Sequence, residues 1–192
     1  MKSLKHYITE SVHTYNYTIK IAGDVDKNFI DLFKYNLNKF DPIRISDPVK
    51  TPIQKNPYGF LPLVMAMVRS ADDNPKNSNL QRRTPLYEKY TEVRKYLKKH
   101  GITQTSRAAF FRLKPNDSVG RHIDDGTYYE TRDRYHLSLQ GTYLYEVDGE
   151  ERQIEPGTFF WFDNKKYHSA WNNGTVDRIT FVFDVPHSAK NP

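Results

Sequence analysis

The stretch that decides the fold is IEPGTFFWFDNKKYHSAWNNGTVDRITFVFDV, residues 154–185. It contains short runs rich in aromatic and β-branched residues, separated by turn residues such as PG and NNG. The same pattern reaches back to about residue 105 through RAAFFRLKP, RYHLSLQG and TYLYEVDG. Short strands at this spacing, without helices between them, are typical of an antiparallel sandwich or jelly roll.

The N-terminal part has a different pattern. YNYTIKIAG, residues 15–23, alternates like a strand, DKNFIDLFKYNLNKFD has apolar residues at helical spacing, and PIRIS is typical of a second short strand. A proline-rich stretch follows, which favours a boundary near residue 57. We therefore predict a leader with a small β-α-β appendage over residues 1–57 and a main domain over residues 58–192.

Two further elements are expected at the start of the main domain. GFLPLVMAMVRS, residues 59–70, is apolar enough for a buried strand. TPLYEKYTEVRKYLKKHG, residues 84–101, has the cap, the proline and the apolar spacing of a helix. Its alternating Glu and Lys residues are typical of a solvated face rather than of a nucleic-acid or membrane surface. The predicted fold class is mainly β with flanking helices.

Composition narrows the kind of site that the chain can carry. The 29 Lys and Arg residues against 23 Asp and Glu give a net charge of +6, but no continuous basic stripe marks a nucleic-acid groove. There is no Cys, so a metal would have to be held by His and carboxylate side chains. No apolar run approaches a membrane span, and MKSLKHYITES lacks the apolar core of a secretory signal. We therefore expect a cytoplasmic protein that does not contact a membrane.

A candidate metal site begins in GRHIDDG, residues 120–126. His122 and Asp124 are two apart, so in an extended chain their side chains project to the same side. Taken alone, a loop rich in Asp and Gly is typical of a solvated turn. A third ligand would come from His136 or His168. Two histidines and one carboxylate on one face of a metal leave open positions, as in non-haem Fe(II) oxygenases.

A candidate anion site follows His168. Arg178 comes ten residues later, in the otherwise apolar run RITFVFDV. An arginine in such a strand needs an anionic partner, and a guanidinium that faces into a barrel can bind a dicarboxylate through two parallel hydrogen bonds. The order of the HxD pair, the distal His and this Arg favours the metal interpretation over the solvated turn.

Residues 105–186 resemble the Fe(II)- and 2-oxoglutarate-dependent oxygenases. The fragments RHIDDG, RDRYHLSLQG and the strands after residue 154 are most similar to the aspartyl/asparaginyl β-hydroxylase family, which also includes free-proline hydroxylases. The resemblance implies a double-stranded β-helix, which is a cupin-like jelly roll. It also implies that His122, Asp124 and His168 bind Fe(II) and that Arg178 binds the distal carboxylate of the cosubstrate 2-oxoglutarate.

The resemblance implies roles for two more residues. Arg134 and His136 match positions that, in the asparaginyl branch, help to bind the other end of 2-oxoglutarate. The alternatives are a surface ion pair of Arg134 with Asp133 or Glu130, and a buried structural role for His136. Some members lack the carboxylate between the two histidines, so the retained Asp124 is closer to the proline-hydroxylase pattern.

The implied activity is hydroxylation of an amino-acid side chain, with release of succinate and CO2. The substrate would be a free amino acid such as proline, or an Asp, Asn or Pro residue in a polypeptide. Two alternatives remain. One is a catalytically inactive jelly-roll binding or structural module, and the other is a cupin-type metal enzyme without 2-oxoglutarate, for which Arg178 would be dispensable.

The leader carries a separate resemblance. MKSLKHYITES is similar to the short N-terminal targeting peptides of prohead core proteins in tailed phages, which are cleaved after a Glu in a context that Ile8-Thr9-Glu10 matches. This implies a phage origin, location in the host cytoplasm or the virion, and a virion or capsid partner for residues 1–57. A plain amphipathic tail is the alternative.

Overall fold

The computed structural model describes residues 19–24, 59–70, 72–84, 87, 95 and 107–187. Of the helix predicted over residues 84–101, Tyr87 and Lys95 are described, and both are helical. The leader with Glu10 and the helix and second strand predicted for the appendage lie outside the described residues. The domain boundary near residue 57 therefore stays a prediction.

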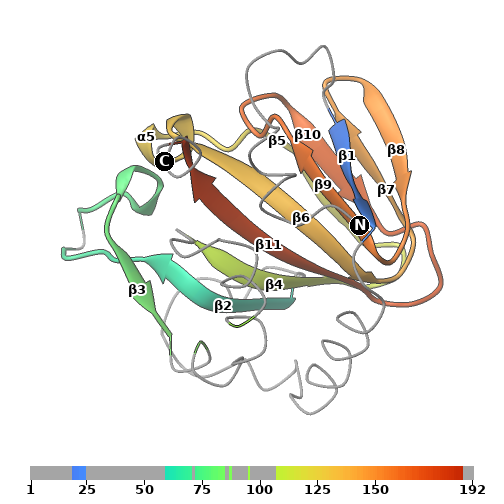
Figure 1. The fold of residues 1–192 in the computed structure, drawn as a ribbon, viewed down its shortest axis with the longest axis horizontal. Helices are drawn as coiled ribbons and strands as arrows, with labels where there is room; N and C mark the ends of the chain where they lie inside the picture. Colours follow the sequence, from blue (N-terminus) through green and yellow to red (C-terminus); the bar gives the residue numbers. More distant parts are fainter. Residues whose placement is uncertain are drawn as a thin grey trace.

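Eight consecutive strands are divided between two antiparallel sheets, and the chain changes sheet at every step except from β7 to β8 (Figure 1). They are β4 (Ala108–Leu113), β5 (Ser118–His122), β6 (Arg132–Gln140), β7 (Tyr143–Val147), β8 (Glu150–Ile154), β9 (Thr158–Phe162), β10 (His168–Trp171) and β11 (Arg178–Pro186). The larger sheet contains the order β9-β6-β11-β4, and the smaller sheet has the order β5-β10-β7-β8. This winding is the double-stranded β-helix, or jelly roll, that the sequence predicted.

Three strands extend the larger sheet. β2 (Gly59–Ala66) pairs with β4, and β3 (Gln81–Arg83) pairs with β2, so the apolar run after residue 58 forms the predicted strand. β1 (Ile19–Asp24) pairs with β9 at the opposite edge. One strand from the predicted appendage is thus part of the main sheet.

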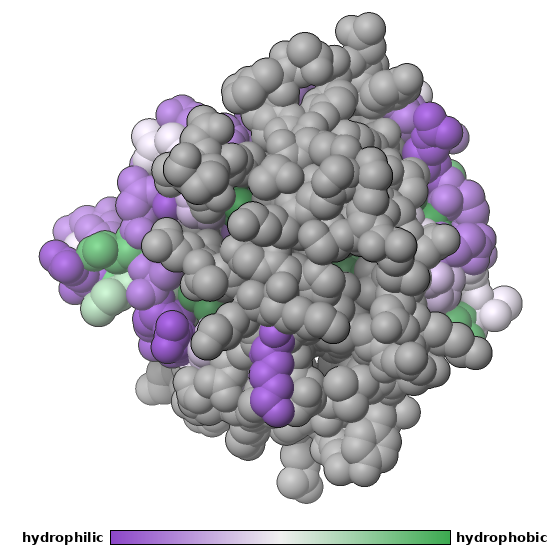
Figure 2. Space-filling view, in the orientation of Figure 1, coloured by the Kyte–Doolittle hydropathy of each residue, from purple (hydrophilic) through white to green (hydrophobic). Residues whose placement is uncertain are grey.

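Two short helical elements with described bounds lie in loops. The 3-10 helix η3 (Pro75–Asn77) lies between β2 and β3, and the helix α5 (Thr127–Glu130) lies between β5 and β6. Figure 2 shows that the part of the loop around η3 visible on this face is mostly hydrophilic. Among the residues that the structure describes, no helix is long and apolar enough to span a membrane.

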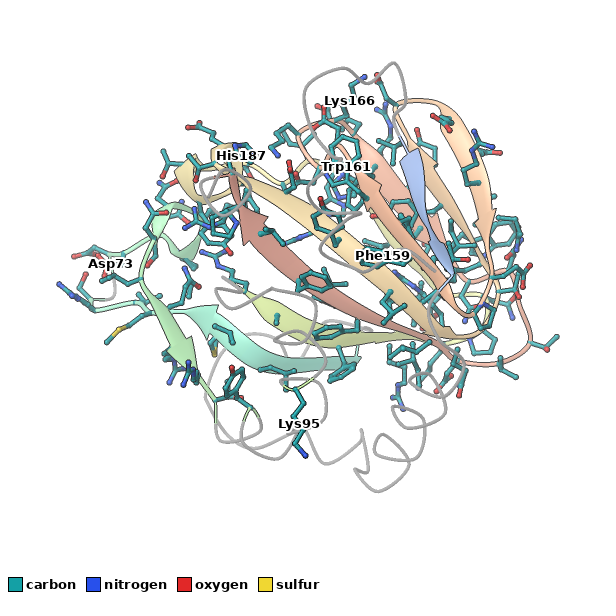
Figure 3. All side chains as sticks on the ribbon, viewed as in Figure 1. Asp73, Lys95, Phe159, Trp161, Lys166 and His187 are labelled. Carbon is teal, nitrogen blue, oxygen red and sulfur yellow. The ribbon has the colours of Figure 1, made fainter. Side chains whose placement is uncertain are left out.

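The larger sheet has two faces of different chemistry. On the face that points away from the smaller sheet, the rings of Tyr135, Phe159 and Phe183 stack with centroid distances of 5.5–6.1 Å (Phe159 is labelled in Figure 3). Since strand residues alternate between faces, their neighbours such as Arg134 and His136 point toward the smaller sheet. The interior between the sheets therefore receives the polar residues of β6 and β11.

Apolar packing closes the rest of the interior. Seven buried residues of the four strands β7 to β10 form one cluster, namely Tyr143, Tyr145, Val147, Ile154, Phe160, Phe162 and Ala170. A fully buried side chain of the larger types stabilises the fold by roughly 1.5–3 kcal/mol. The cluster holds the two sheets together and fixes the strands that carry the polar residues.

Candidate metal centre and anion site

The metal candidates meet where β5 ends and β10 begins. His122, the last residue of β5, lies directly opposite His168, the first residue of β10, and their ring centroids are 4.2 Å apart. Asp124 follows two residues after β5, and its backbone N–H donates to the carbonyl of Asn164 over 2.9 Å. One ligand atom from each of His122, Asp124 and His168 lies within 4.8 Å of the others. The structure thus brings together these three residues, and His136 is not part of the group.

Both histidines present Nε2 as the free ligand atom. Nδ1 of His122 lies 2.7 Å from the carbonyl oxygen of Gly120, and Nδ1 of His168 lies 2.9 Å from that of Lys166 (labelled in Figure 3). Because a carbonyl oxygen can only accept, Nδ1 carries the proton and Nε2 of the neutral ring has the lone pair. Burial lowers the pKa of His168, which favours this neutral form. Histidine ligands of metals are usually held in this way.

Asp124 is held by one oxygen. Its Oδ2 accepts hydrogen bonds from Nη1 of Arg134 over 2.7 Å and from Nδ2 of Asn164 over 3.1 Å. No described side chain donates to Oδ1, so this oxygen is available to a cation. Two imidazoles and one carboxylate form a donor set that fits Fe(II).

Arg134 is largely buried and lies between two carboxylates. Besides the bond to Asp124, its Nε donates to Oδ1 of Asp184 over 2.8 Å and its Nη2 donates to Oδ2 of Asp184 over 3.1 Å. Burial opposes the charge of Arg134, but Asp124 and Asp184 outweigh burial and raise the pKa of the guanidinium well above its ordinary value. Arg134 therefore stays charged and joins β6 to both β11 and the metal loop.

Arg178 is the second buried guanidinium and has no such partner. Its Nε donates to Oγ1 of Thr180 over 2.8 Å, and its guanidinium lies over the ring of Tyr143, 4.3 Å from the centroid. Only 4% of Arg178 is exposed. Within the described ranges no carboxylate pairs with it, so a permanent positive charge is buried without an anion.

Three orphaned polar atoms lie on elements around Arg178. Nδ1 of His136, Oγ of Ser138 and the hydroxyl of Tyr143 are buried and have no hydrogen-bond partner among the residues that the structure describes. Ser138 lies opposite Thr180 in the register of β6 and β11. Burial, and then the charges of Arg178 and Arg134, lower the pKa of His136 well below its ordinary value, so its ring is neutral. A guanidinium without a carboxylate partner and two orphaned hydroxyls nearby suit a polar, anionic ligand.

The sequence interpretation missed several residues of this interior. They are Ser138, Tyr143, Asn164, Thr180 and Asp184. A signal for two of them was present in RITFVFDV, because strict alternation places Thr180 and Asp184 on the same face as Arg178. Asn164 gave no such signal, since it lies in the turn between β9 and β10 and contacts Asp124 only through the fold.

The fold and the site define a double-stranded β-helix protein with a His-Asp-His candidate metal centre. The family model for aspartyl/asparaginyl beta-hydroxylase matches residues 72–188, which include all six residues singled out from the sequence. The match covers more than half of the chain, and the protein belongs to this family. The predicted family resemblance is thereby confirmed.

Solved structures also match parts of the chain. A predicted oxalate decarboxylase from Thermotoga maritima has a TM-score of 0.37 and 23% identity, with 43% of this chain and 67% of that chain covered. A Cupin 2 conserved barrel domain protein from Salinispora arenicola has a TM-score of 0.36 and 13% identity, with 44% and 66% covered. A protein with a double-stranded beta-helix domain from Klebsiella pneumoniae has a TM-score of 0.38 and 17% identity, with 45% and 72% covered. No curated protein matches the chain.

Proposed function

We propose that this protein is an Fe(II)- and 2-oxoglutarate-dependent hydroxylase of an amino-acid side chain, free or in a polypeptide, which releases succinate and CO2. Membership of the aspartyl/asparaginyl β-hydroxylase family supports a hydroxylase-type oxygenase. The observation that carries the cosubstrate is Arg178, whose buried charge lacks a carboxylate among the described residues. A dicarboxylate bound there would neutralise it.

The metal would be held by three atoms. His122 and His168 would bind Fe(II) through Nε2, and Asp124 would bind it through Oδ1, because their other polar atoms are already hydrogen-bonded. When bound, the metal and 2-oxoglutarate supply the oxidising chemistry with O2. The chain's own contribution is to fix the three ligands, bind the anion and shield the interior from water.

The anion would be bound by the polar face of β6 and β11 and by β7. Arg178 would donate to the distal carboxylate, and the orphaned hydroxyls of Ser138 and Tyr143 would donate to the same end. Arg134 uses three of its five N–H groups on Asp184 and Asp124, which leaves two for the end of the cosubstrate near the metal. Two arginines in one interior match a molecule with a carboxylate at each end.

The substrate would approach on the side of β5. His122 is exposed, whereas His168 is buried, so the metal group opens toward solvent on one side. Ile123 and Tyr167 are exposed beside the two histidines, and the guanidinium of Arg121 lies 4.4 Å from the centroid of the Tyr167 ring. These side chains would form the first surface that a substrate side chain meets.

The proposal is tested by anaerobic addition of Fe(II) and then 2-oxoglutarate to the full chain. We expect the weak visible absorption band that 2-oxoglutarate gives when it chelates Fe(II). His168→Ala should abolish the band, and Arg178→Leu should raise the 2-oxoglutarate concentration needed for it while Fe(II) binding is retained. Succinate release in a screen of amino acids and peptides would then identify the substrate.

Each failure of this test has a separate meaning. Fe(II) binding without the band, unaffected by Arg178→Leu, would favour a metal enzyme that does not use 2-oxoglutarate. A folded wild-type protein that binds neither Fe(II) nor 2-oxoglutarate would contradict the proposal and favour a binding module.

A further inference from the structure

We infer that Asp184 is a positioning residue for the metal centre, which acts through Arg134 to orient Asp124. The inference rests on the proposed function, because it requires a metal at Asp124. Asp184 lies near the end of β11, directly opposite Arg134 in the register of β6 and β11. It does not belong to the three-residue metal group, so its effect on the metal is indirect.

The hydrogen bonds fix the direction in which Arg134 points. Asp184 engages one edge of the planar guanidinium through Nε and Nη2, at 2.8 and 3.1 Å. A bidentate pair of this kind sets the orientation of the whole guanidinium plane. Nη1 is left at the other side, and it donates to Oδ2 of Asp124 over 2.7 Å. The three side chains form a row of alternating charge from β11 to the metal loop.

Asp184 is itself anchored from two directions. Only 2% of its side chain is exposed, and its Oδ2 also accepts a hydrogen bond from the hydroxyl of Tyr128 over 3.0 Å. Its backbone N–H donates to the carbonyl of Arg107 over 2.9 Å, and the N–H of Arg107 donates to the same Tyr128 hydroxyl over 2.9 Å. The carboxylate therefore has one position, from which it can hold Arg134.

This anchoring matters because Asp124 lies in a loop rather than in a strand. The bond from Arg134 occupies Oδ2, so Oδ1 is the oxygen presented toward the two histidines. If Asp184 lost its charge, Arg134 would lose its bidentate acceptor and would be free to turn wholly onto Asp124. Groups that orient metal ligands in this way typically change metal affinity about 10–100-fold when they are removed.

The test is Mn(II) affinity of the full chain, measured from the electron paramagnetic resonance signal of free Mn(II). We expect Asp184→Asn to weaken Mn(II) binding about 10-fold or more, in the range found for groups that orient ligands. The matched control is Asp133→Asn, which also replaces a buried carboxylate by an amide. Asp133 contacts His187 and Lys165, whereas Asp184 contacts Arg134. This control should bind Mn(II) within about 2-fold of the wild type, since neither contact reaches a ligand.

A double variant separates positioning from a general loss of structure. In Arg134→Met, Asp184 becomes a buried charge without its cation, so adding Asp184→Asn should raise the melting temperature above that of Arg134→Met. If Asp184 acts only through Arg134, the double variant should bind Mn(II) no more weakly than Arg134→Met alone.

The outcomes distinguish this inference from the proposed function. Wild-type protein that binds no Mn(II) and no Fe(II) would overturn both. Wild-type protein that binds Mn(II), with Asp184→Asn equally tight, would overturn the inference alone. The same holds if Asp133→Asn weakens Mn(II) as much as Asp184→Asn does, or if the losses in the double variant multiply.

Discussion

The interior holds two buried arginines in opposite electrostatic situations. Arg134 has two carboxylate partners, whereas no carboxylate among the described residues pairs with Arg178. The charge of the first arginine is therefore neutralised within the structure, and that of the second is not neutralised by any described carboxylate. The contrast makes the two residues separable by experiment, because they should respond to substitution in different ways.

Replacing Arg178 should stabilise the ligand-free protein. A buried charge without its counter-ion costs about 3–5 kcal/mol when a partner is removed, so an apolar side chain of similar length at the position of such a charge removes a cost of that kind. We expect Arg178→Met to raise the free energy of unfolding in urea while 2-oxoglutarate binding is lost. Arg134→Met should instead lower the free energy of unfolding, because it leaves Asp184 unpaired. A destabilised Arg178→Met protein would show that Arg178 has an anionic partner in the ligand-free protein.

His136 should make stability depend on pH. Burial, together with the charges of Arg178 and Arg134, lowers its pKa well below 6.5 in the folded chain. In the unfolded chain the pKa is about 6.5, so below that pH the unfolded state binds a proton that the folded state does not. The free energy of unfolding should therefore fall as the pH falls below about 6.5.

The measurement is urea unfolding of wild type and His136→Phe at pH 7 and pH 5.5. His136 lies among the rings of Tyr145, Phe160 and Phe162, so phenylalanine suits the surroundings. The variant should lose less stability between the two pH values. The pKa of His168 is also lowered, so His136→Phe should retain part of the dependence of the free energy of unfolding on pH. An unchanged slope in His136→Phe would contradict the assignment.

At the scale of elements, the η3 segment packs closely on the loop that carries Asp124. Lys76 forms an ion pair with Asp125, and Oδ1 of Asn77 accepts from the N–H of Thr127 over 3.1 Å. Gly126 permits this approach, because its φ is +105° and a Cβ there would lie 2.6 Å from the carbonyl oxygen of Lys76.

Gly126→Ala should therefore separate the two segments. A non-glycine residue in this backbone region costs about 1–3 kcal/mol, and the contact with Lys76 adds to that cost. We expect a lower free energy of unfolding and faster amide hydrogen exchange in residues 74–78. Gly120→Ala is the matched control, since no atom lies within 4 Å of a Cβ at that position and its φ is not positive. Equal effects of the two substitutions would rule out the close approach as the cause.

The strands of the barrel were predictable because each one alternates or is bounded by a turn residue. The run EERQIEPGTFFWFD forms two strands, β8 in the smaller sheet and β9 in the larger sheet. The chain reverses there at Gly157, whose φ is +96°. The sequence patterns of β5 and α5 are weaker, because β5 is mostly exposed and α5 has four residues. Local periodicity cannot specify elements that are so exposed or so short.

The site was predictable as far as residue types and their order allow. His122, Asp124 and His168 meet as their spacing and the family pattern imply. The support of Asp124 by Arg134 and Asn164 could not be predicted, since it depends on how β6 and the β9–β10 turn approach a loop from far along the chain. The three metal candidates and Arg178 could be predicted from the sequence, whereas the residues that hold them in position could not.

For the whole molecule, metal binding should appear as thermal stability. A ligand that binds only the folded state at 100 times its dissociation constant adds about 2.7 kcal/mol. For a chain of this size, that corresponds to a melting temperature higher by roughly 5–10 °C. We expect this shift with Mn(II) in differential scanning calorimetry, and no shift in His168→Ala. A shift of equal size in His168→Ala would place the metal elsewhere.

The stacked rings of Tyr135, Phe159 and Phe183 on the far face of the larger sheet have a consequence for how this chain can change. Their aromatic packing holds β6, β9 and β11 together on one face of the sheet. This packing does not involve the side chains on the opposite face. Substitutions among the interior polar residues can then accumulate without loss of the strand arrangement. The scaffold is in this sense evolvable, since substitutions on the interior face can change the ligand preference while the aromatic face preserves the ability to fold.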